Sequence, residues 1–438
     1  MEELNKDVMQ AVEALKYRVT VGDVAARAGI NVEVAQQGLL ALASETQGHM
    51  QVSETGEIAY EFSRSFRSTL RNKYWQIRMQ ALLSKVWQVA FYIVRISFGI
   101  MLMLSLLIIA IAILALFIAM SSQQGGNSRD DRRGGGFSFG FSPFNIFYLF
   151  DFNYGRGRRR YPNQPSRGYR GRPTTKQGDK LQLLEAIFSF LFGDGDPNAD
   201  LEERRWQTIG RVITNNGGAI AAEQVVPYLD ELGEGWDKEY EDYMLPVLSR
   251  FNGQPEVSPT GDMVYYFPEL QVSAMERGKS SVGAYLKEAK RKFTAATSDQ
   301  VMLSIGLGSA NIIGAVVLQG MLENALAQGI VLPAAAVFAQ SILGVLMFYG
   351  ISFLTIPLVR YYWVQWRNSK IEKRNDERAE RATALNRLGA AFQQKLAFAQ
   401  QFASQKVLKE SDTVYSTDQD LSEQAIESEE FMRRLNEI

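Results

Sequence analysis

Two short stretches of the chain are closely alike, and together they decide the fold of its non-membrane part. "QVSETGEIAYEF" (Gln51–Phe62) and "EVSPTGDMVYYF" (Glu256–Phe267) are identical at six of twelve positions. Each has a Thr-Gly pair between two runs that suit strands, which predicts a hairpin. We expect Gly56 and Gly261 to turn the tips with positive φ. The alternating aromatic residues of each returning strand should face a core. The repeat therefore indicates a duplicated domain.

The segments that precede the two hairpins also follow a common order. In the first copy, helical patterns and caps predict helices over 5–16, 21–28 and 32–45. In the second copy, "GGAIAAEQVVPYL" parallels "RVTVGDVAARAG", and "KEYEDYMLPVLSRF" parallels the third helix. Three helices followed by a hairpin are the order of a winged-helix domain. We predict one such domain over 1–62 and a second, acidic one over 181–270.

Winged-helix domains often bind DNA, but the charges of these two copies disfavour that function. Such domains place their third helix in the major groove, and contacts to phosphate require cations. The first copy has no Lys or Arg between Ala28 and Ser63, and residues 194–242 hold 13 acidic and 4 basic side chains. We therefore expect these domains to bind other proteins, or each other, and we expect no nucleic-acid partner.

The composition disfavours several kinds of chemistry. The chain of 438 residues has no cysteine, one histidine (His49) and a net charge of −1. Without cysteine, no zinc–thiolate site or thiolate-ligated iron–sulfur cluster can form within the chain. A lone His before a turn is more often a surface residue than a catalytic base. The Asp/Asn run over 194–200 begins like a calcium loop but lacks its glycine and closing glutamate. We predict no enzyme activity, no cofactor and no metal site.

Three long apolar stretches predict membrane-spanning helices. The first, "ISFGIMLMLSLLIIAIAILALFIAM" (96–120), has no charged residue, and about 20 apolar residues suffice to cross a bilayer core. The second covers 301–322 and the third 332–359, with a short connection that predicts a hairpin. The run "RYYWVQWR" at the end of the third span is typical of a membrane interface. We therefore predict a mainly α-helical membrane protein that contacts lipids through these spans.

Small residues lie four positions apart in the second span. Gly306, Ala310 and Gly314 form a row that lets helix backbones approach closely. The same stretch, "GLGSAN", could also be a nucleotide-binding loop, but nothing before it resembles a strand. We therefore predict that these three residues pack against another helix.

The remaining segments connect the predicted domains and spans. We predict a linker helix over 63–95, a disordered basic linker over 121–180, a basic lead-in helix over 271–300 and a helical or coiled-coil tail over 360–438. The basic linker has 12 basic and 4 acidic residues, which favours contact with anionic lipid headgroups. Its aromatic segment 137–152 contains a proline and an aspartate, so we expect an interfacial element there and not a full crossing.

The side of the membrane on which the first domain lies is left open. The hairpin of the second and third spans places the middle region and the tail together, and their basic flanks favour the cytoplasmic or stromal side. A single crossing at 96–120 would place the first domain opposite, although basic residues flank that end too. An even number of crossings between the two copies would remove this conflict.

One stretch also resembles a known family. The segment "FSFLFGDGDPNADLEERRW", with "GGAIAAEQVVPYLD" and "LPVLSRFNGQPEVSPTGDMVYYFPELQ", resembles integral membrane proteins of cyanobacteria and chloroplasts. Plant members are labelled "iron–sulfur cluster biosynthesis family protein". The resemblance covers about residues 188–270 and the general membrane layout. It implies an integral location in a thylakoid, plasma or envelope membrane, and it brings no catalytic motif.

These observations favour a non-enzymatic membrane protein whose duplicated domains and C-terminal helix dock other proteins. Assembly or maintenance of a photosynthetic membrane complex is the process that this location suggests. One alternative is a membrane-tethered winged-helix transcription regulator. Another is an accessory role in iron–sulfur cluster biogenesis without ligation of a cluster. A transporter is disfavoured because the spans hold very little charge.

Overall fold

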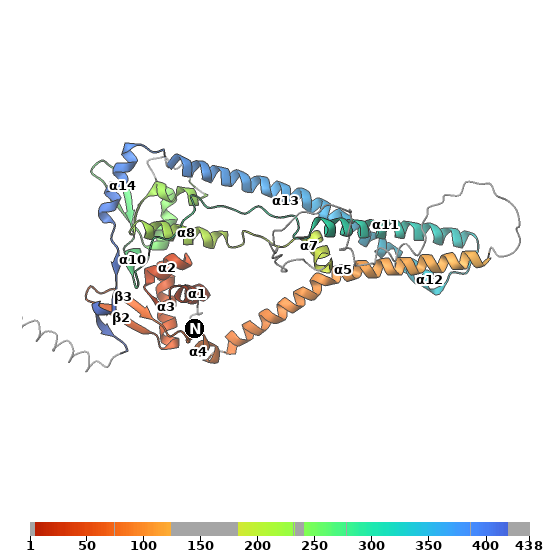
Figure 1. Cartoon of the computed structure of the whole chain (residues 1–438), viewed down its shortest axis with the longest axis horizontal. Helices are drawn as coiled ribbons and strands as arrows, with labels where there is room; N and C mark the ends of the chain where they lie inside the picture. Colours follow the sequence, from red (N-terminus) through yellow and green to blue (C-terminus); the bar gives the residue numbers. More distant parts are fainter. Residues whose placement is uncertain are drawn as a thin grey trace, which may run out of the picture. The chain divides into compact units, whose positions relative to one another are not determined.

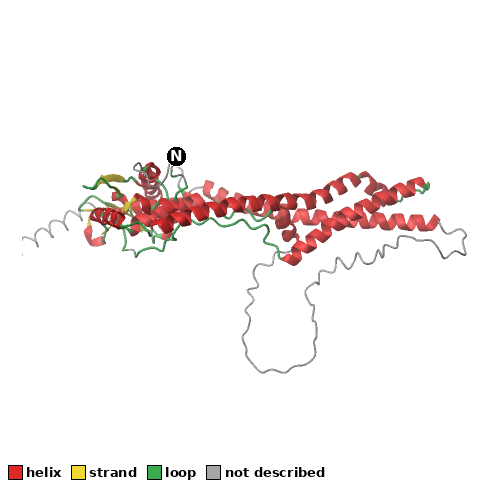
Figure 2. Cartoon of the chain, turned by 90° about the horizontal axis from the view of Figure 1, so that it is seen from above, coloured by secondary structure: helices red, strands yellow, loops and turns green. Residues whose placement is uncertain are grey.

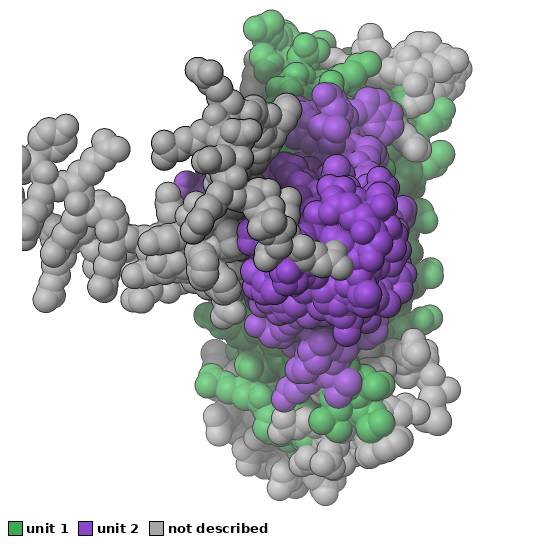
Figure 3. All heavy atoms as spheres, turned by 90° about the vertical axis from the view of Figure 1, so that its right-hand side faces the viewer, with its two compact units in different colours: residues 1–84, 196–291, 367–438 green, residues 85–195, 292–366 purple. Residues whose placement is uncertain are grey.

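The computed structural model describes residues 5–73, 75–123, 183–230, 232, 241–276, 278–385 and 387–418. The chain divides into two compact units, coloured separately in Figure 3. Unit 1 is built from the segments 1–84, 196–291 and 367–438, and unit 2 from 85–195 and 292–366. Helices dominate (Figure 2), and the strands of the described residues all belong to unit 1. The predicted linker, from residue 124 on, and its aromatic segment lie outside the described residues.

The first repeat of unit 1 has the order helix, strand, helix, helix and hairpin. Its elements are α1 (Lys6–Ala14), β1 (Arg18–Val19), α2 (Val21–Ala28), α3 (Val32–Thr46), β2 (His49–Ser53) and β3 (Ile58–Glu61) (Figure 1). Thr20 and Asp23 form a capping box at the start of α2, and Asn31 accepts a hydrogen bond from the Glu33 amide at the start of α3. Gly29, with φ of +68°, ends α2 in the left-handed region that glycine takes without strain.

The second repeat follows a similar order with shorter elements. They are α8 (Leu201–Asn215), β4 (Ala219–Ala221), the 3-10 turns η1 (Ala222–Gln224), η2 (Val226–Tyr228) and η3 (Asp242–Met244), α9 (Leu245–Phe251), β5 (Gln254–Val257) and β6 (Met263–Tyr266). Two 3-10 turns stand where the first repeat has α2, and Pro227 lies at the start of the second turn. Proline has no N–H to continue a helix ladder, which accounts for the shorter turns.

The two hairpins have the same geometry. Gly56 and Gly261 have φ of +85° and +87° at the tips, and no atom lies within 4 Å of a Cβ built at either position. The aromatic residues of the returning strands are buried in one hydrophobic core that both repeats share, which confirms the expectation that they face inward. These residues are Tyr60, Phe62, Tyr265 and Phe267.

C-terminal segments complete unit 1. They are α14 (Ala390–Phe402), β8 (Lys406–Val407), η4 (Glu410–Asp412) and β9 (Thr413–Ser416). Strand β9 pairs antiparallel with β2, so the first sheet has the order β1-β3-β2-β9, whereas the second has β4-β6-β5. After β6 come α10 (Pro268–Gln271) and β7 (Val272–Ser273), and β7 pairs in parallel with β8. The tail is therefore part of the fold of unit 1.

Unit 2 is helical. Its helices are α5 (Trp75–Gln123), α7 (Leu183–Phe192), α11 (Ser298–Ala327), α12 (Ala334–Ser341) and α13 (Leu343–Leu385), with the first residues of α5 and the last residues of α13 assigned to unit 1. Among the described residues, three helices are long and apolar enough to cross a membrane, which confirms the prediction of a mainly helical protein with three such helices. They cover Lys85–Ser122, Ser298–Ala327 and Leu343–Leu385. The first two extend beyond the predicted 96–120 and 301–322, whereas the third begins later than the predicted 332–359, because α12 is a separate helix, and ends beyond it.

Two segments differ from their predicted form. The lead-in helix predicted over 271–300 is wrong, because the described residues between 274 and 297 contain no helix. The linker segment predicted as helical over 63–95 contains α4 (Phe66–Lys73) and the start of α5, and residue 74 lies outside the described residues. The tail predicted as helical or coiled-coil over 360–438 is helical only in part. Helix α14 begins after Gly389, which has extended backbone, and two short strands follow it.

Candidate functional site

The two repeats of unit 1 meet where α2 packs against α8, and we name this contact the repeat seam. A Cβ at Gly210 of α8 would lie 2.9 Å from the backbone of Ala26 in α2. A Cβ at Gly29 would lie 2.7 Å from the amide nitrogen of Gln207. Such close backbone approach leaves no space for a side chain, so the seam depends on glycine at both positions.

Polar contacts fasten the repeat seam. The Arg250 guanidinium of α9 stacks 4.2 Å from the centroid of the Trp206 ring and donates a hydrogen bond to the Gly29 carbonyl. The carboxylate of Asp23 accepts a hydrogen bond of 2.9 Å from the amide of Ala274. These contacts join residues that are far apart in the sequence. The described parts of both repeats therefore form a single module.

The outer faces of the third helices are open and lack free cations. Helix α3 contains no Lys or Arg and exposes Val34 and Leu40 by 41% and 44%. Helix α9 exposes Leu245 by 63% at its first turn. Its arginine, Arg250, is engaged by Trp206 and the Gly29 carbonyl. Within the described residues, these two faces present apolar side chains without available positive charge.

Helix α13 supplies cations to two acidic residues of the middle segment, of which Glu288 is buried and Asp230 is partly exposed. Arg378 is 1% exposed and pairs with Asp230 and, at 2.9 Å, with Glu288, which is 4% exposed. Arg374 donates a 2.7 Å hydrogen bond to the Glu288 carboxylate. Burial alone would raise the pKa of Glu288, but the hydrogen bonds and charges of Arg374 and Arg378 lower it below its ordinary value. Part of the acidic charge of the second repeat is therefore neutralised within the chain.

Helix α14 supplies a second such pairing. The Lys395 ammonium lies 2.8 Å from a Glu223 oxygen and 2.7 Å from a Glu241 oxygen, and all three side chains are largely buried. Burial alone would lower the pKa of Lys395, but the two carboxylates raise it above its ordinary value. The tail therefore binds the acidic repeat by two separate ionic clusters.

A third pairing lies at the hairpin of the first repeat. Lys406 of β8 contacts the Glu57 carboxylate at 2.8 Å. Burial would raise the pKa of Glu57, but hydrogen bonds from Lys406, Thr55 and Ser53 outweigh it and lower the pKa to about 2. Glu57 therefore stays ionised over the physiological range and holds β8 against the hairpin.

Four asparagine side chains hold the segment between residues 280 and 291 in an extended form. Each donates to the carbonyl and accepts from the amide of one residue, at 2.8–2.9 Å. The pairs are Asn215 with Ser280, Asn375 with Glu288, Asn198 with Ala289 and Asn368 with Arg291. These bonds satisfy the backbone groups that a helix would pair internally, which explains why the predicted lead-in helix is absent. No local spacing in the sequence signals this arrangement.

A small cavity of about 150 Å³ opens beside the repeat seam. It is lined by α2, α8, α10 and the residues around 278–280 and 404–405. Three of its lining side chains are cationic: Arg27, Arg211 and Lys279. Burial and then the charge of Arg27 lower the pKa of the Arg211 guanidinium. Sequence reasoning missed this site because its cations come from three separated segments.

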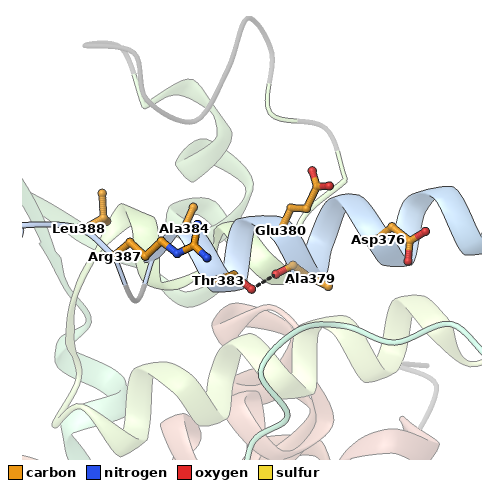
Figure 4. Close-up of a pocket in the computed structure, with 7 residues that line it drawn as sticks. All are labelled: Asp376, Ala379, Glu380, Thr383, Ala384, Arg387 and Leu388. Atoms are coloured by element: carbon orange, nitrogen blue, oxygen red, sulfur yellow. Dashed lines mark hydrogen bonds between the residues drawn. The ribbon is translucent and has the colours of Figure 1, made fainter.

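A larger hollow of about 750 Å³ lies along the last turns of α13 (Figure 4). Its lining residues are Asp376, Ala379, Glu380, Thr383, Ala384, Arg387 and Leu388. All of them come from α13 and the turn that follows it. The described residues thus provide one wall only, and they do not enclose a ligand there.

The row predicted to pack in unit 2 is only partly in contact. Gly306 is exposed and has no atom within 4 Å of a built Cβ, and Ala310 is half-buried. A Cβ at Gly314 would lie 2.9 Å from Cγ2 of Ile109 in α5. The tightest approach is at Gly308, where a Cβ would lie 2.6 Å from the Phe353 ring of α13. Helix α11 therefore packs against its neighbours through Gly308 and Gly314, and not through Gly306.

Buried polar side chains join the helices of unit 2. Asn311 of α11 is fully buried and donates to the Ser105 hydroxyl of α5. Its other amide atom, Oδ1, faces Gly350 of α13, where a Cβ would lie 2.7 Å away. Polar contacts of this kind add to helix association in apolar surroundings. One asparagine thus lies at the meeting point of the three long helices.

The described residues contain no group of three or more His, Cys, Asp or Glu side chains placed to hold a metal ion. His49 lies on the surface, 3.4 Å from Asp418. The fold and these contacts define a helical protein with three membrane-length apolar helices and a module made of two joined repeats.

This chain belongs to the same family as an uncharacterised chloroplastic protein of Arabidopsis thaliana. The two are 37% identical over 453 residues, an alignment that covers 100% of this chain and 83% of that protein. No protein-family model and no solved structure matches the chain. The relative is described as chloroplastic, which supports a chloroplast association, and it carries no iron–sulfur label, so it does not support that part of the resemblance.

Proposed function

We propose that the chain is a non-enzymatic, multi-pass protein of a chloroplast-type membrane whose two repeats are winged-helix domains joined into one protein-docking module. The observation that supports docking is that the third helix of each repeat, α3 and α9, exposes apolar side chains to solvent. Helix α3 exposes Val34 and Leu40, and α9 exposes Leu245. Exposed apolar side chains without free cations suit a protein surface, whereas DNA would require several cations.

The partner that fits this module is a protein surface with an apolar centre and a basic rim. Glu33 lies in the first turn of α3, Glu54 lies at the tip of the hairpin that follows, and the described residues show no cationic partner for either. Charge complementarity of this kind favours encounter with a basic surface and discourages acidic ones. A subunit of a photosynthetic membrane complex, bound during assembly or maintenance, is the partner that we propose.

An integral membrane position agrees with the exterior of unit 2. Trp87, Met302 and Phe348 are each more than 70% exposed on its long helices. Large side chains of this kind would be unfavourable against water, and lipid would cover them. The exposed apolar surface therefore supports three membrane spans.

We also propose that both repeats lie on the same side of the membrane. The segments 1–84, 196–291 and 367–438 pack into one unit, and a bilayer cannot separate parts of one packed core. The hairpin of α11 and α13 returns the chain to its starting side. Consequently the chain between residues 84 and 196 crosses an even number of times, as the basic residues at both ends of that region also suggest. The proposal therefore requires one crossing in this region besides α5, in addition to the three long helices.

The absence of cysteine gives a direct test of sidedness. Ser44→Cys, Ser249→Cys and Ser411→Cys would each place one thiol on an exposed part of unit 1. A membrane-impermeant maleimide should label all three or none in sealed vesicles of one orientation. Gln328→Cys, in the turn after α11, should show the opposite accessibility. Labelling of Ser44→Cys without Ser249→Cys would refute the shared compartment.

The docking proposal is tested by the introduction of negative charge on the open face. In the full chain, Val34→Glu and Leu40→Glu should abolish chemical crosslinks between α3 and a membrane-complex subunit, because a carboxylate cannot enter an apolar contact. Arg64→Gln, an exposed change on unit 1, is the matched control and should leave the crosslinks intact. Equal crosslinking by all variants would oppose docking through α3. Retention of duplex DNA by the full chain at low salt would instead favour the transcription-regulator alternative.

A further inference from the structure

The cavity beside the repeat seam has the composition of an anion site. Arg27 comes from α2 of the first repeat, Arg211 from α8 of the second and Lys279 from the extended segment that follows β7. The cavity volume of about 150 Å³ is below the ~300–1,000 Å³ of sites for drug-sized ligands. A small ligand is therefore the appropriate occupant.

The three cations are not neutralised by the described part of the chain. The described residues show no ion pair and no side-chain hydrogen bond for Arg27, Arg211 or Lys279. The lining includes one carboxylate, that of Asp23, and its Oδ2 accepts from the amides of Thr20 and Ala274 at 3.1 and 2.9 Å. The cavity thus has an excess of positive charge at its wall.

This excess has an energetic consequence. The two guanidinium groups repel each other, and this repulsion, after burial, lowers the pKa of Arg211. The buried cations Arg378 and Lys395 of unit 1 have close carboxylate partners, whereas half-buried Arg211 and the exposed Arg27 and Lys279 have none within the described residues. Bound anion would offset the repulsion here, and guanidinium groups are suited to phosphate because they donate parallel hydrogen bonds to its oxygens.

We propose that this cavity binds a phosphate group, held between Arg27 and Arg211 and approached by Lys279. Three cations match the charge of a phosphate monoester better than that of a single carboxylate. The phosphate could be free or part of a lipid headgroup, since both present the same oxygens. Because the arginines belong to different repeats, bound phosphate would stabilise the repeat seam by linkage. The proposal does not depend on the docking function.

Calorimetric titration of the detergent-solubilised full chain tests this site. The probes are inorganic phosphate, glycerol phosphate, short-chain phosphatidic acid and acetate, at constant ionic strength set with chloride. We expect phosphate binding that weakens about tenfold or more in Arg27→Gln and in Arg211→Gln. Arg64→Gln, which removes an exposed cation outside the cavity, should bind as the unmodified chain does.

The outcomes separate the sources of the phosphate. Binding of phosphatidic acid alone would identify a headgroup, and binding of inorganic or glycerol phosphate would identify a free anion. Arg211→Gln should also unfold at an unchanged or higher temperature without ligand, because the repulsion is removed. If that variant does not fold, exposed Lys279→Gln provides the same affinity test. The site is refuted if no phosphate compound binds, if acetate binds as tightly, or if Arg64→Gln weakens binding as much as the cavity variants do.

Discussion

The pairing of Lys395 with two glutamates makes a sharp prediction about the attachment of the tail. Its ammonium lies 2.8 and 2.7 Å from oxygens of Glu223 and Glu241, and the three side chains are 8%, 18% and 10% exposed. The second oxygen of each glutamate is already buried without a hydrogen-bond partner. Lys395→Met keeps much of the apolar volume but removes the cation. It leaves two buried carboxylates that face each other without compensation.

Breaking a buried ion pair by removal of one partner costs about 3–5 kcal/mol. We therefore expect amides of α14 to exchange with solvent about a hundredfold faster or more in Lys395→Met, since each 1.4 kcal/mol is a factor of ~10. Hydrogen exchange of the full chain in detergent measures this change locally. Lys373→Met is the matched control, because Lys373 is 80% exposed and its ion pair with Glu377 is long, at 3.9 Å. Its effect should stay below about 1 kcal/mol.

The pH dependence gives an independent check on the same reasoning. The two glutamates raise the pKa of Lys395 in the folded state above its ordinary value of 10.5. A raised folded pKa gives stability that is present below the unfolded value and lost as the pH rises through the folded value. The loss of protection in Lys395→Met should therefore be full at pH 7 and shrink as the pH rises above 10.5. Adding Glu223→Gln and Glu241→Gln should restore part of the protection. If Lys395→Met lost no more protection from exchange than Lys373→Met, or if its loss did not change with pH, the Lys395 pairing would not be what holds α14.

Two further predictions concern unit 2 and the first hairpin. Gly308→Ala should lower the unfolding free energy in mixed detergent by about 1–3 kcal/mol, because its Cβ meets the Phe353 ring. Gly306→Ala is the control and should be neutral or stabilising. Equal effects of the two substitutions would show that α11 does not pack through Gly308. The folded pKa of Glu57, about 2, lies below its unfolded value of 4.5, so its contact with Lys406 is present above pH 4.5 and lost as the pH falls toward 2. Amides over 406–416 should exchange faster in that window, because the region loses about 1 kcal/mol or less of local stability, as expected for a partly exposed pair. Glu57→Gln should make this exchange nearly independent of pH over the same window.

Features that depend on local patterns could be predicted from the sequence. Apolar length indicated the three long helices, and the repeated Thr-Gly hairpins indicated positive φ at Gly56 and Gly261, which have φ of +85° and +87°. The alternation in the returning strands indicated which aromatic residues are buried. Each of these properties is set by residues within a single helix or a single hairpin.

Features that depend on distant segments could not be predicted. The extended form of residues 280–291 depends on Asn368 and Asn375, which follow about 80 residues later. The cavity at the repeat seam requires Arg27 and Arg211 to meet. The sequence predicts a packing row of Gly306, Ala310 and Gly314 on α11, whereas the closest approach is at Gly308. A row of small residues shows where helices can approach, but the neighbouring side chains decide which row is used.

The edges of the two hairpins show how the duplicated repeats have diverged. In the first repeat, the Met50 amide donates to the Thr417 hydroxyl at 2.9 Å, and the Thr417 amide donates back to the Met50 carbonyl at 3.1 Å. These bonds extend the pairing of β9 with β2. Met50 pairs with Tyr60 across its hairpin, and Pro255 pairs with Tyr265 in the same register. Proline therefore occupies the position whose amide would donate outward.

Because Pro255 has no N–H, the outer edge of β5 cannot repeat the bonds that secure β9, and proline at an edge discourages strand addition. The tail accordingly contacts the second repeat in another way. Phe402 of α14 stacks on Tyr266 of β6, with ring centroids 5.7 Å apart, and Lys395 enters the acidic cluster. One chain terminus thus binds two related domains by different means, a strand on one and a helix on the other. The proline explains why the two attachments are not interchangeable.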